Sequence, residues 1–232
     1  HRHYRRQRQM CIRDRVVIRL IGSDYSVLKL AVFRNFFAVI PLLVLLFISK
    51  EFSSLFKNIN KKFLSLCCFR GLSFLAMNIF IFISVINVEF ATAMTLTFSS
   101  PFFIVILSII FLQDRVGIYR WSAIIIGFIG VLLILRPTSE IFNFFSIFSI
   151  LTAFAWGVTV MILKFIPPNF STSKIQFYTL IFNVIGASIL FIILSNDFTV
   201  NSIKDLMLMV LTGILGGTAV SYTHLTLPTI MP

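Results

Sequence analysis

Charged residues are scarce in this chain of 232 residues, in which they make up 12% of the total while hydrophobic residues make up 58%. A soluble domain carries about 25% charged residues, because they must cover its surface. The shortage excludes a soluble enzyme. It also excludes a nucleic-acid-binding module despite the net charge of +12, since the basic residues are scattered over loops and chain ends. The apolar side chains must therefore face a lipid bilayer.

Histidine is confined to the two ends of the chain, and outside those ends the cysteines are the adjacent pair Cys67 and Cys68. A metal site needs several His, Cys or carboxylate ligands at suitable spacing, which this inventory does not supply. The sequence also lacks a GxxxxGK[ST] phosphate-binding loop. We therefore expect no metal, no cofactor, no His-based catalysis and no ATP-driven step.

The two ends of the chain resemble translated adapter DNA. Segment 5–14 (RRQRQMCIRD) can be encoded by a DNA whose reverse complement encodes VSYTHLTLPT, which is segment 220–229. This inverted element is similar to the tag that transposase-based sequencing libraries add to fragments. We expect residues 1–15 and 220–232 to be adapter-derived, and they are set aside from fold reasoning. The alternative is that the basic start is an arm that binds a membrane surface or a nucleic acid.

Seven apolar runs are long enough to cross a bilayer, which takes about 20 residues per helix. These runs are apolar on every side, whereas a membrane-spanning strand alternates apolar and polar residues. The predicted spans are 29–49, 63–86, 90–112, 118–135, 144–165, 175–194 and 206–220. The sequence thus predicts an all-α membrane protein, a polytopic helical bundle.

Basic residues are distributed unequally between the two sides of this bundle. Nine Lys and Arg lie on the side of segment 50–62, and five lie on the other side. Because short cytoplasmic loops carry the excess of Lys and Arg, we expect segment 50–62 in the cytoplasm. The protein is then a multi-pass protein of a bacterial cytoplasmic (inner) membrane.

An internal repeat is visible at an offset of 145 residues. Segment 16–48 aligns without gaps with segment 161–193, and Ser26/Ser171 and Lys29/Lys174 are among its identical pairs. With its missing first helix counted, the repeat holds five spans. Because five is an odd number, the second copy enters the membrane in the opposite orientation, as in secondary transporters with inverted repeats. We expect a first repeat over 16–137 without its first helix, and an incomplete second repeat over 138–219. The chain would then hold about seven of ten helices.

The order of features along the chain is similar to that of a known family. These features are Arg34 in FRNFF, Arg70-Gly71, FATAMTLTFSSPFF with Pro101, the turn Asp114-Arg115, and RWSAIIIGFIGVLLILRP. The combination resembles the EamA-type half of the drug/metabolite transporter superfamily, with Asp114 where that family usually has Glu. Within it, the chain looks most like the branch that includes S-adenosylmethionine uptake carriers. The resemblance implies a carrier for a small metabolite.

Polar side chains at membrane depth are candidates for a solute site, because each of them needs a partner or a wet cavity. Helical spacing predicts three polar stripes: Thr92, Thr95 and Ser99; Ser149, Thr152, Trp156 and Thr159; and Gln176, Thr179 and Asn183. The Trp156 ring would suit a sulfonium or an amine. The competing interpretation is hydrogen bonding within or between helices, which we favour for the third stripe.

Three charged residues lie near or inside the predicted spans. Arg34 is a candidate for capturing a carboxylate, whereas Arg70 is interpreted as snorkelling to the interface. Glu89 is a weak candidate for a coupling group, with a solvated turn as the favoured alternative. The predicted substrate-binding set is Arg34, Thr92, Thr95, Ser99, Trp156, Thr159 and Asn183. The glycines Gly127, Gly130, Gly213, Gly216 and Gly217 are expected to allow close helix packing.

These features together favour a secondary transporter that moves a small polar or zwitterionic metabolite, amino-acid-like or S-adenosylmethionine-like, by alternating access. Its expected partners are the lipid bilayer and a small-molecule solute, without nucleic acid, and a homodimer is left open. One alternative is a membrane-embedded enzyme acting on lipid or peptide, and another is a non-transporting scaffold. The sequence leaves the substrate, the direction of transport and the coupling ion open.

Overall fold

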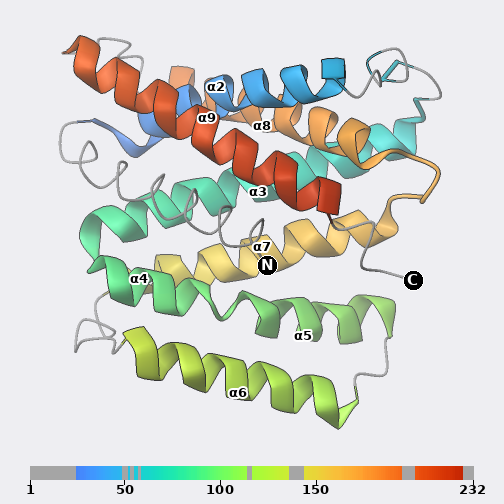
Figure 1. Cartoon of the computed structure of the whole chain (residues 1–232), viewed down its shortest axis with the longest axis vertical. Helices are drawn as coiled ribbons and strands as arrows, with labels where there is room; N and C mark the ends of the chain where they lie inside the picture. Colours follow the sequence, from blue (N-terminus) through green and yellow to red (C-terminus); the bar gives the residue numbers. More distant parts are fainter. Residues whose placement is uncertain are drawn as a thin grey trace. The chain divides into compact units, whose positions relative to one another are not determined.

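The computed structural model describes residues 25–48, 52, 55–56, 59–113, 117–135, 144–194 and 202–226. All the regular structure in these residues is helical (Figure 1). The helices are α2 (Val27–Ile48), α3 (Lys61–Asn87), α4 (Phe90–Thr97), α5 (Ser100–Leu112), α6 (Ile118–Leu135), α7 (Ser146–Phe165), α8 (Thr172–Leu194) and α9 (Ile203–Thr226). Of the predicted adapter-derived ends, 1–15 and 227–232 lie outside the described residues, and the backbone of 220–226 continues α9.

The predicted spans correspond to these helices. Five segments are long and apolar enough to cross a membrane: Val27–Ile48, Lys61–Asn87, Phe90–Leu112, Ser146–Phe165 and Thr172–Leu194. A shorter apolar segment, Trp121–Leu133, lies within α6. The prediction of an all-α, polytopic membrane protein is thereby confirmed.

The third predicted span, 90–112, is broken in its middle. α4 ends at Thr97, Phe98 and Ser99 form a turn, and α5 begins at Ser100 with Pro101 in its first turn. Proline has no N–H to donate to the preceding turn of a helix, but it is well accommodated in the first turn, where no such bond is made. Pro101 therefore accounts for a new helix beginning at this point.

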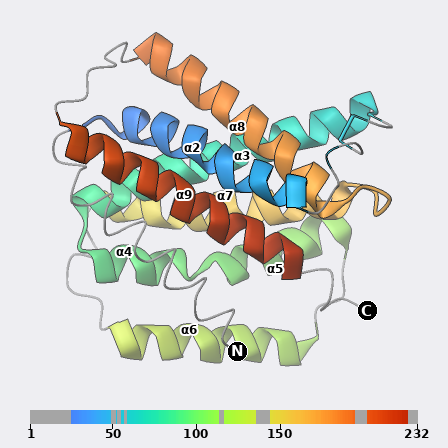
Figure 2. The same cartoon turned by 45° about the horizontal axis from the view of Figure 1, so that its top comes forward.

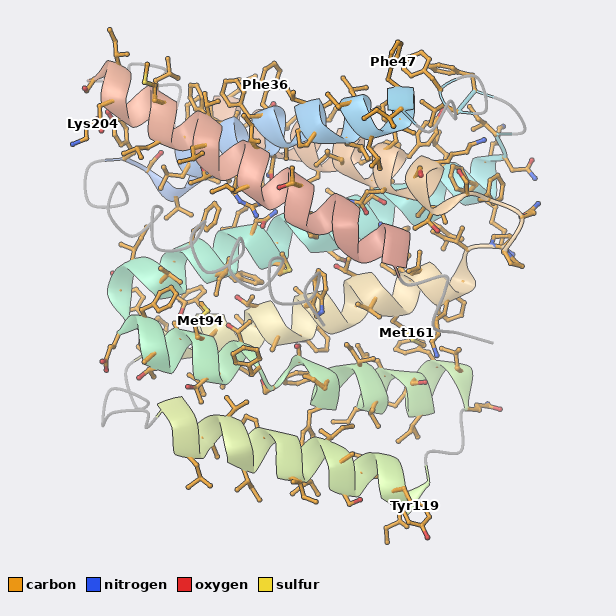
Figure 3. The ribbon with its side chains drawn as sticks, in the orientation of Figure 1. Phe36, Phe47, Met94, Tyr119, Met161 and Lys204 are labelled. Carbon is orange, nitrogen blue, oxygen red and sulfur yellow. The ribbon has the colours of Figure 1, made fainter. Side chains whose placement is uncertain are left out.

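Large apolar side chains cover the outside of the helices. Phe36 and Phe47 on α2 and Tyr119 on α6 point away from the helices around them (Figure 3), and they are 60%, 80% and 86% exposed. A soluble protein rarely exposes contiguous apolar surface on this scale. In a bilayer these side chains contact lipid, which explains why the apolar runs are apolar on every side.

The chain forms two compact units, and the boundary between them falls within α3. The first unit consists of His1–Leu72 and Ile166–Pro232, and the second consists of Ser73–Phe165. In the second unit, α4 and α5 lie between α7 and α6 (Figures 1 and 2). Gly157 of α7 permits the close approach of α5, since a Cβ added there would lie 3.2 Å from the Cβ of Phe103.

In the first unit, α2 packs against both α8 and α9. α2 and α8 run antiparallel: Asn35, early in α2, bonds to Asn183, whereas Leu42, further along α2, packs in one apolar cluster with the earlier residue Leu180. α2 and α9 run parallel, because Tyr25 bonds to Asp205 and later residues of α2 meet later residues of α9.

Glycines make these contacts close. A Cβ at Gly213 would lie 2.8 Å from the carbonyl oxygen of Arg34, and one at Gly217 would lie 2.7 Å from that of Ala38. The prediction of close packing is therefore confirmed for Gly213 and Gly217. It is wrong for Gly127 and Gly130 of α6, where an added Cβ would meet nothing within 4 Å among the described residues. The reason is that these two glycines face away from the neighbouring helices.

Candidate functional site

A group of buried polar side chains lies in the apolar interior of the first unit. We call it the midplane cluster, and it consists of Asn35, Arg70, Gln176, Thr179 and Asn183. Asn183 stands at the midpoint of α8, and Asn35 lies within one turn of the midpoint of α2. These helices are long enough to span the hydrocarbon core, so the pair of Asn35 and Asn183 lies about half-way along two candidate membrane spans, whereas Gln176 lies near the start of α8.

The positions of these residues follow from helical geometry. Gln176, Thr179 and Asn183 are spaced three and four residues apart, so they share one face of α8. Gly71 brings α3 against this face, since a Cβ there would lie 2.8 Å from the carbonyl oxygen of Thr179. Because α3 and α8 approach so closely, Arg70 can reach across to α8.

Hydrogen bonds connect the cluster across three helices. The Nδ2 of Asn35 donates to the Oδ1 of Asn183 at 2.8 Å. The Nη1 of Arg70 donates to the Oγ1 of Thr179 at 2.8 Å and to the Oε1 of Gln176 at 3.4 Å. The third predicted stripe is thus engaged in bonds between helices, as the favoured interpretation expected.

One donor of the cluster is unused. The Nδ2 of Asn183 is buried and has no hydrogen-bond partner among the residues that the structure describes. Leaving a buried N–H without an acceptor costs about 1–3 kcal/mol, and the hydrocarbon core supplies no water to replace the missing partner. This atom is therefore a place where an acceptor from a solute would be stabilising.

Arg70 is not a snorkelling residue, so that interpretation of the sequence was wrong. Its side chain is only 3% exposed, and two of its hydrogen bonds go to neutral side chains of α8. Snorkelling would carry the guanidinium to the interface, whereas the contact at Gly71 turns it inward. A charge held at this depth is expensive and marks a functional site by default. An Arg-Gly pair inside an apolar run is the signal that could have identified it.

The side chain of Arg34, a residue of α2, lies in the interface between α2 and α9. A Cβ at Gly216 would lie 2.6 Å from its Nη2, so the missing side chain of Gly216 leaves the space that the guanidinium occupies. Asn35, the next residue, points to α8 instead. The structure therefore places two predicted site residues of the first unit, Arg34 and Asn183, in two neighbouring helix interfaces.

The second unit contains the other predicted site residues. Thr92, Thr95 and Thr159 are buried, and α4 packs against α7, the helix that carries Thr159. The hydroxyls of Thr95 and Thr159 donate to carbonyl oxygens of their own helices, at 2.8 and 2.9 Å. Ser99 bonds in the same way to the carbonyl oxygen of Leu96. These bonds match the alternative interpretation of the stripes, and a solute role for them stays a prediction.

Trp156 and Glu89 also lie in the second unit. The Trp156 ring is 6.5 Å from that of Phe74 and tilted by 47°, so it has the aromatic contact that its position within a span requires. Glu89 is the residue before α4, is partly exposed and does not cap the helix with its side chain. Glu89 thus lies in the turn between α3 and α4, which matches the favoured interpretation of a solvated turn residue.

The described residues hold no group of three or more His, Cys, Asp or Glu that could bind a metal ion. What the midplane cluster offers is one cation and several amide and hydroxyl groups. Such a set can hold the acceptor atoms of a polar solute by hydrogen bonds. None of its five side chains is a carboxylate, a histidine, a cysteine or a lysine, the groups that most often act as general bases or nucleophiles.

Comparison with known proteins gives one family and several relatives. The sequence model of the EamA-like transporter family matches residues 15–136. The riboflavin transporter of Rhizobium johnstonii is 39% identical over 72 residues, which cover 31% of this chain and 24% of that protein. The S-adenosylmethionine uptake transporter of Rickettsia bellii is 32% identical over 90 residues, which cover 39% of this chain and 31% of that protein. The chain thus matches less than a third of the length of these relatives.

Proposed function

The chain belongs to the EamA-like transporter family, and from that premise we propose that it is part of a secondary carrier for a small polar or zwitterionic metabolite. It is a multi-pass membrane protein, and its relatives are named as transporters. We propose the bacterial cytoplasmic membrane as its location. The chemistry that we propose is binding and release of a solute, without the making or breaking of bonds.

The single observation that carries this proposal is the midplane cluster. In transporters built from inverted repeats, the solute site lies near the centre of the bilayer, at the interface of the two repeats. The hydrogen bond from Asn35 to Asn183 joins α2 to α8, the two helices that the offset of 145 residues makes equivalent. This position of the buried polar groups supports the proposal that they form the solute site.

Two sets of contacts support the inverted repeat. α2 and α8 run in opposite directions, as equivalent helices of inverted repeats do. A Cβ at Gly71 would crowd the Thr179 carbonyl oxygen and the Cβ of Phe182, and a Cβ at Gly213 would crowd the corresponding atoms of Arg34 and Phe37. The offset of 145 takes Arg34 to Thr179 and Phe37 to Phe182.

This arrangement supports alternating access as the mechanism. Two halves of opposite orientation can exchange their conformations, and a site between them then opens first to one side of the membrane and then to the other. We propose 16–137 and 138–219 as the two halves. The names of the relatives suggest S-adenosylmethionine and riboflavin as the first solutes to test.

Counterflow in liposomes tests the proposal. The 232-residue chain would be compared with the protein encoded by its gene without the adapter-derived ends, which we call the uninterrupted frame. Each protein would be reconstituted in liposomes, and the liposomes would be loaded with unlabelled S-adenosylmethionine or riboflavin. We expect the uninterrupted frame to accumulate labelled solute that is chemically unchanged. We expect little exchange from the 232-residue chain, which would hold about seven of ten helices. Chemically altered solute would indicate an enzyme instead, and failure of the uninterrupted frame to exchange either solute would contradict the proposal.

A further inference from the structure

The orientation of the Asn183 amide is set by its neighbour on α2. Its Oδ1 accepts the hydrogen bond from Asn35 at 2.8 Å, and its Nδ2 is buried with no partner in the described part of the chain. A primary amide turns as one plane, so the bond at its oxygen also determines where its N–H₂ group points. Asn35 is therefore a positioning residue, and the Asn183 Nδ2 is a donor held ready for an acceptor atom.

A positive charge from α3 lies beside α8, one turn before Asn183. Arg70 donates to Thr179, one turn before Asn183, and the backbone of α3 at Gly71 approaches both residues. A Cβ at Gly71 would lie 2.8 Å from the Thr179 carbonyl oxygen and 3.1 Å from the Asn183 nitrogen. The guanidinium thus contacts α8 one turn before the residue that carries the unused amide donor, and both groups favour a ligand that accepts hydrogen bonds.

We propose that Arg70 and Asn183 bind the carboxylate of the solute; this inference rests on the proposed function. A carboxylate has two acceptor oxygens and a negative charge, so it can accept from a guanidinium and an amide at the same time. Hydrogen bonds to charged groups contribute about 1.5–3 kcal/mol, more than those between neutral groups. The cluster itself is built from a cation, amides and a hydroxyl. It contains no carboxylate of its own, because Asp205, at the start of α9, instead accepts a hydrogen bond from Tyr25.

The position of the cluster makes the carboxylate the part of the solute that is held at the pivot. Asn35 and Asn183 lie close to the crossing of α2 and α8, the two equivalent helices. When two halves rock about such a crossing, groups near it move least, so this end of the solute stays bound while the two sides of the membrane exchange access. The rest of the solute is then recognised by other residues.

Matched probes test the proposal. S-adenosylmethionine carries a carboxylate, its decarboxylated form differs only in lacking it, and riboflavin has none. Binding of each probe to the 232-residue chain in detergent would be measured by the shift in the thermal unfolding of the protein and by titration calorimetry. We expect S-adenosylmethionine to bind at least about tenfold more tightly than its decarboxylated form, as loss of one charge-assisted hydrogen bond implies.

Two substitutions separate the site from general stability. Asn183→Asp keeps the shape and replaces the donor by an acceptor, so it should abolish the preference for the carboxylate. Arg70→Lys keeps the charge and loses the planar geometry, so it should reduce that preference. Asn78→Asp is the control, since Asn78 is a buried asparagine of α3 that lies outside the cluster. It should leave the ratio of the two affinities unchanged in chain that still unfolds cooperatively.

The outcomes distinguish this proposal from the proposed function. Equal affinity for the two forms of S-adenosylmethionine, no binding of either, or an unchanged preference in Asn183→Asp would overturn the carboxylate site. Exchange of riboflavin in liposomes would leave the carrier standing in each of these cases. A chain that binds the carboxylate form tightly, from a gene whose uninterrupted frame exchanges no solute, would support the site and contradict the carrier.

Discussion

Gly71 shows how much one missing methyl group decides at the residue scale. Its hydrogen side chain lets the backbone of α3 approach α8, and this approach brings the adjacent Arg70 within hydrogen-bond distance of Thr179 and Gln176. The buried cation and its partners therefore depend on a residue that makes no polar contact with its own side chain.

Replacing Gly71 by Ala should destabilise the protein. The new Cβ would lie 2.8 Å from a backbone oxygen of Thr179, which cannot move as a flexible side chain can, so the helices must separate. We expect the free energy of unfolding to fall by about 1–3 kcal/mol, the usual cost of overpacking. Thermal or denaturant unfolding in detergent measures this. Gly127→Ala is the control, because its Cβ meets no described atom within 4 Å, and it should be neutral or stabilising.

A substitution at Gly216 tests the role of Arg34 in solute capture separately from effects on stability. A Cβ at Gly216 would crowd the Nη2 of Arg34 at 2.6 Å, but that atom is the far end of a flexible side chain. Gly216→Ala should therefore cost less than Gly71→Ala in unfolding free energy while displacing the guanidinium. If Arg34 captures solute, counterflow by the uninterrupted frame should fall severalfold. Unchanged exchange together with unchanged stability would remove Arg34 from the proposed site.

At the scale of elements, α2 and α8 begin in the same way. Ser26 and Ser171 each precede the first helical residue, and their Oγ atoms accept hydrogen bonds from the backbone nitrogens of Lys29 and Lys174 at 3.3 and 3.4 Å. The two lysines also lie over aromatic rings four residues earlier, Lys29 over Tyr25 and Lys174 over Phe170. Local sequence thus determines both starts, since a serine in this position satisfies an amide that no helical carbonyl reaches.

Equivalent caps should have equivalent energetic effects. Ser26→Ala and Ser171→Ala each remove one capping acceptor, and we expect each to lower the free energy of unfolding by about 0.5–2 kcal/mol. Ser122→Ala is the comparison, because Ser122 lies within α6 and bonds back to the carbonyl oxygen of Tyr119. It should change stability by less than the caps do. A negligible effect at both caps would argue against their role in starting the helices.

At the scale of the whole molecule, the proposed repeat relates contacts that differ in their chemistry. The offset of 145 takes Tyr25 to Phe170, and the offset of 142 that relates Gly71 to Gly213 takes Phe63 to Asp205. The corresponding contacts are a hydrogen bond of 2.8 Å from Tyr25 to Asp205 and a ring stack of 4.2 Å between Phe63 and Phe170. One end of the first unit is therefore joined by a polar contact and the other by an apolar one.

The membrane orientation can be tested with single cysteines. In a variant without the native cysteines, Lys57→Cys should react with a membrane-impermeant maleimide only from the cytoplasmic side, and Glu140→Cys only from outside. The reason is the excess of basic residues on the side of segment 50–62. Both positions lie outside the described residues, so labelling adds information that the structure does not contain. The reverse labelling pattern would show that the charge bias had been read in the wrong direction.

Most of the helices could be predicted, whereas only part of the site could. Length and apolar composition suffice for a membrane helix, because a bilayer satisfies no backbone hydrogen bond. The stripe ending in Asn183 was predicted because helical spacing places its members on one face. Arg70 was misinterpreted because snorkelling and burial begin from the same sequence, an arginine some turns inside a span. The sequence likewise does not distinguish Gly127, which faces outward, from Gly213, which faces α2.

The sequence by itself determined that the chain crosses the membrane repeatedly and where most of its helices lie, since both depend on local composition and spacing. The repeat that relates α2 to α8 stays a prediction. Only the tertiary structure decided which polar residues meet. Arg70 and Thr179, or Asn35 and Asn183, are separated by more than a hundred residues. Their contacts depend on the direction, rotation and distance of packed helices, and a periodic sequence pattern specifies none of these three.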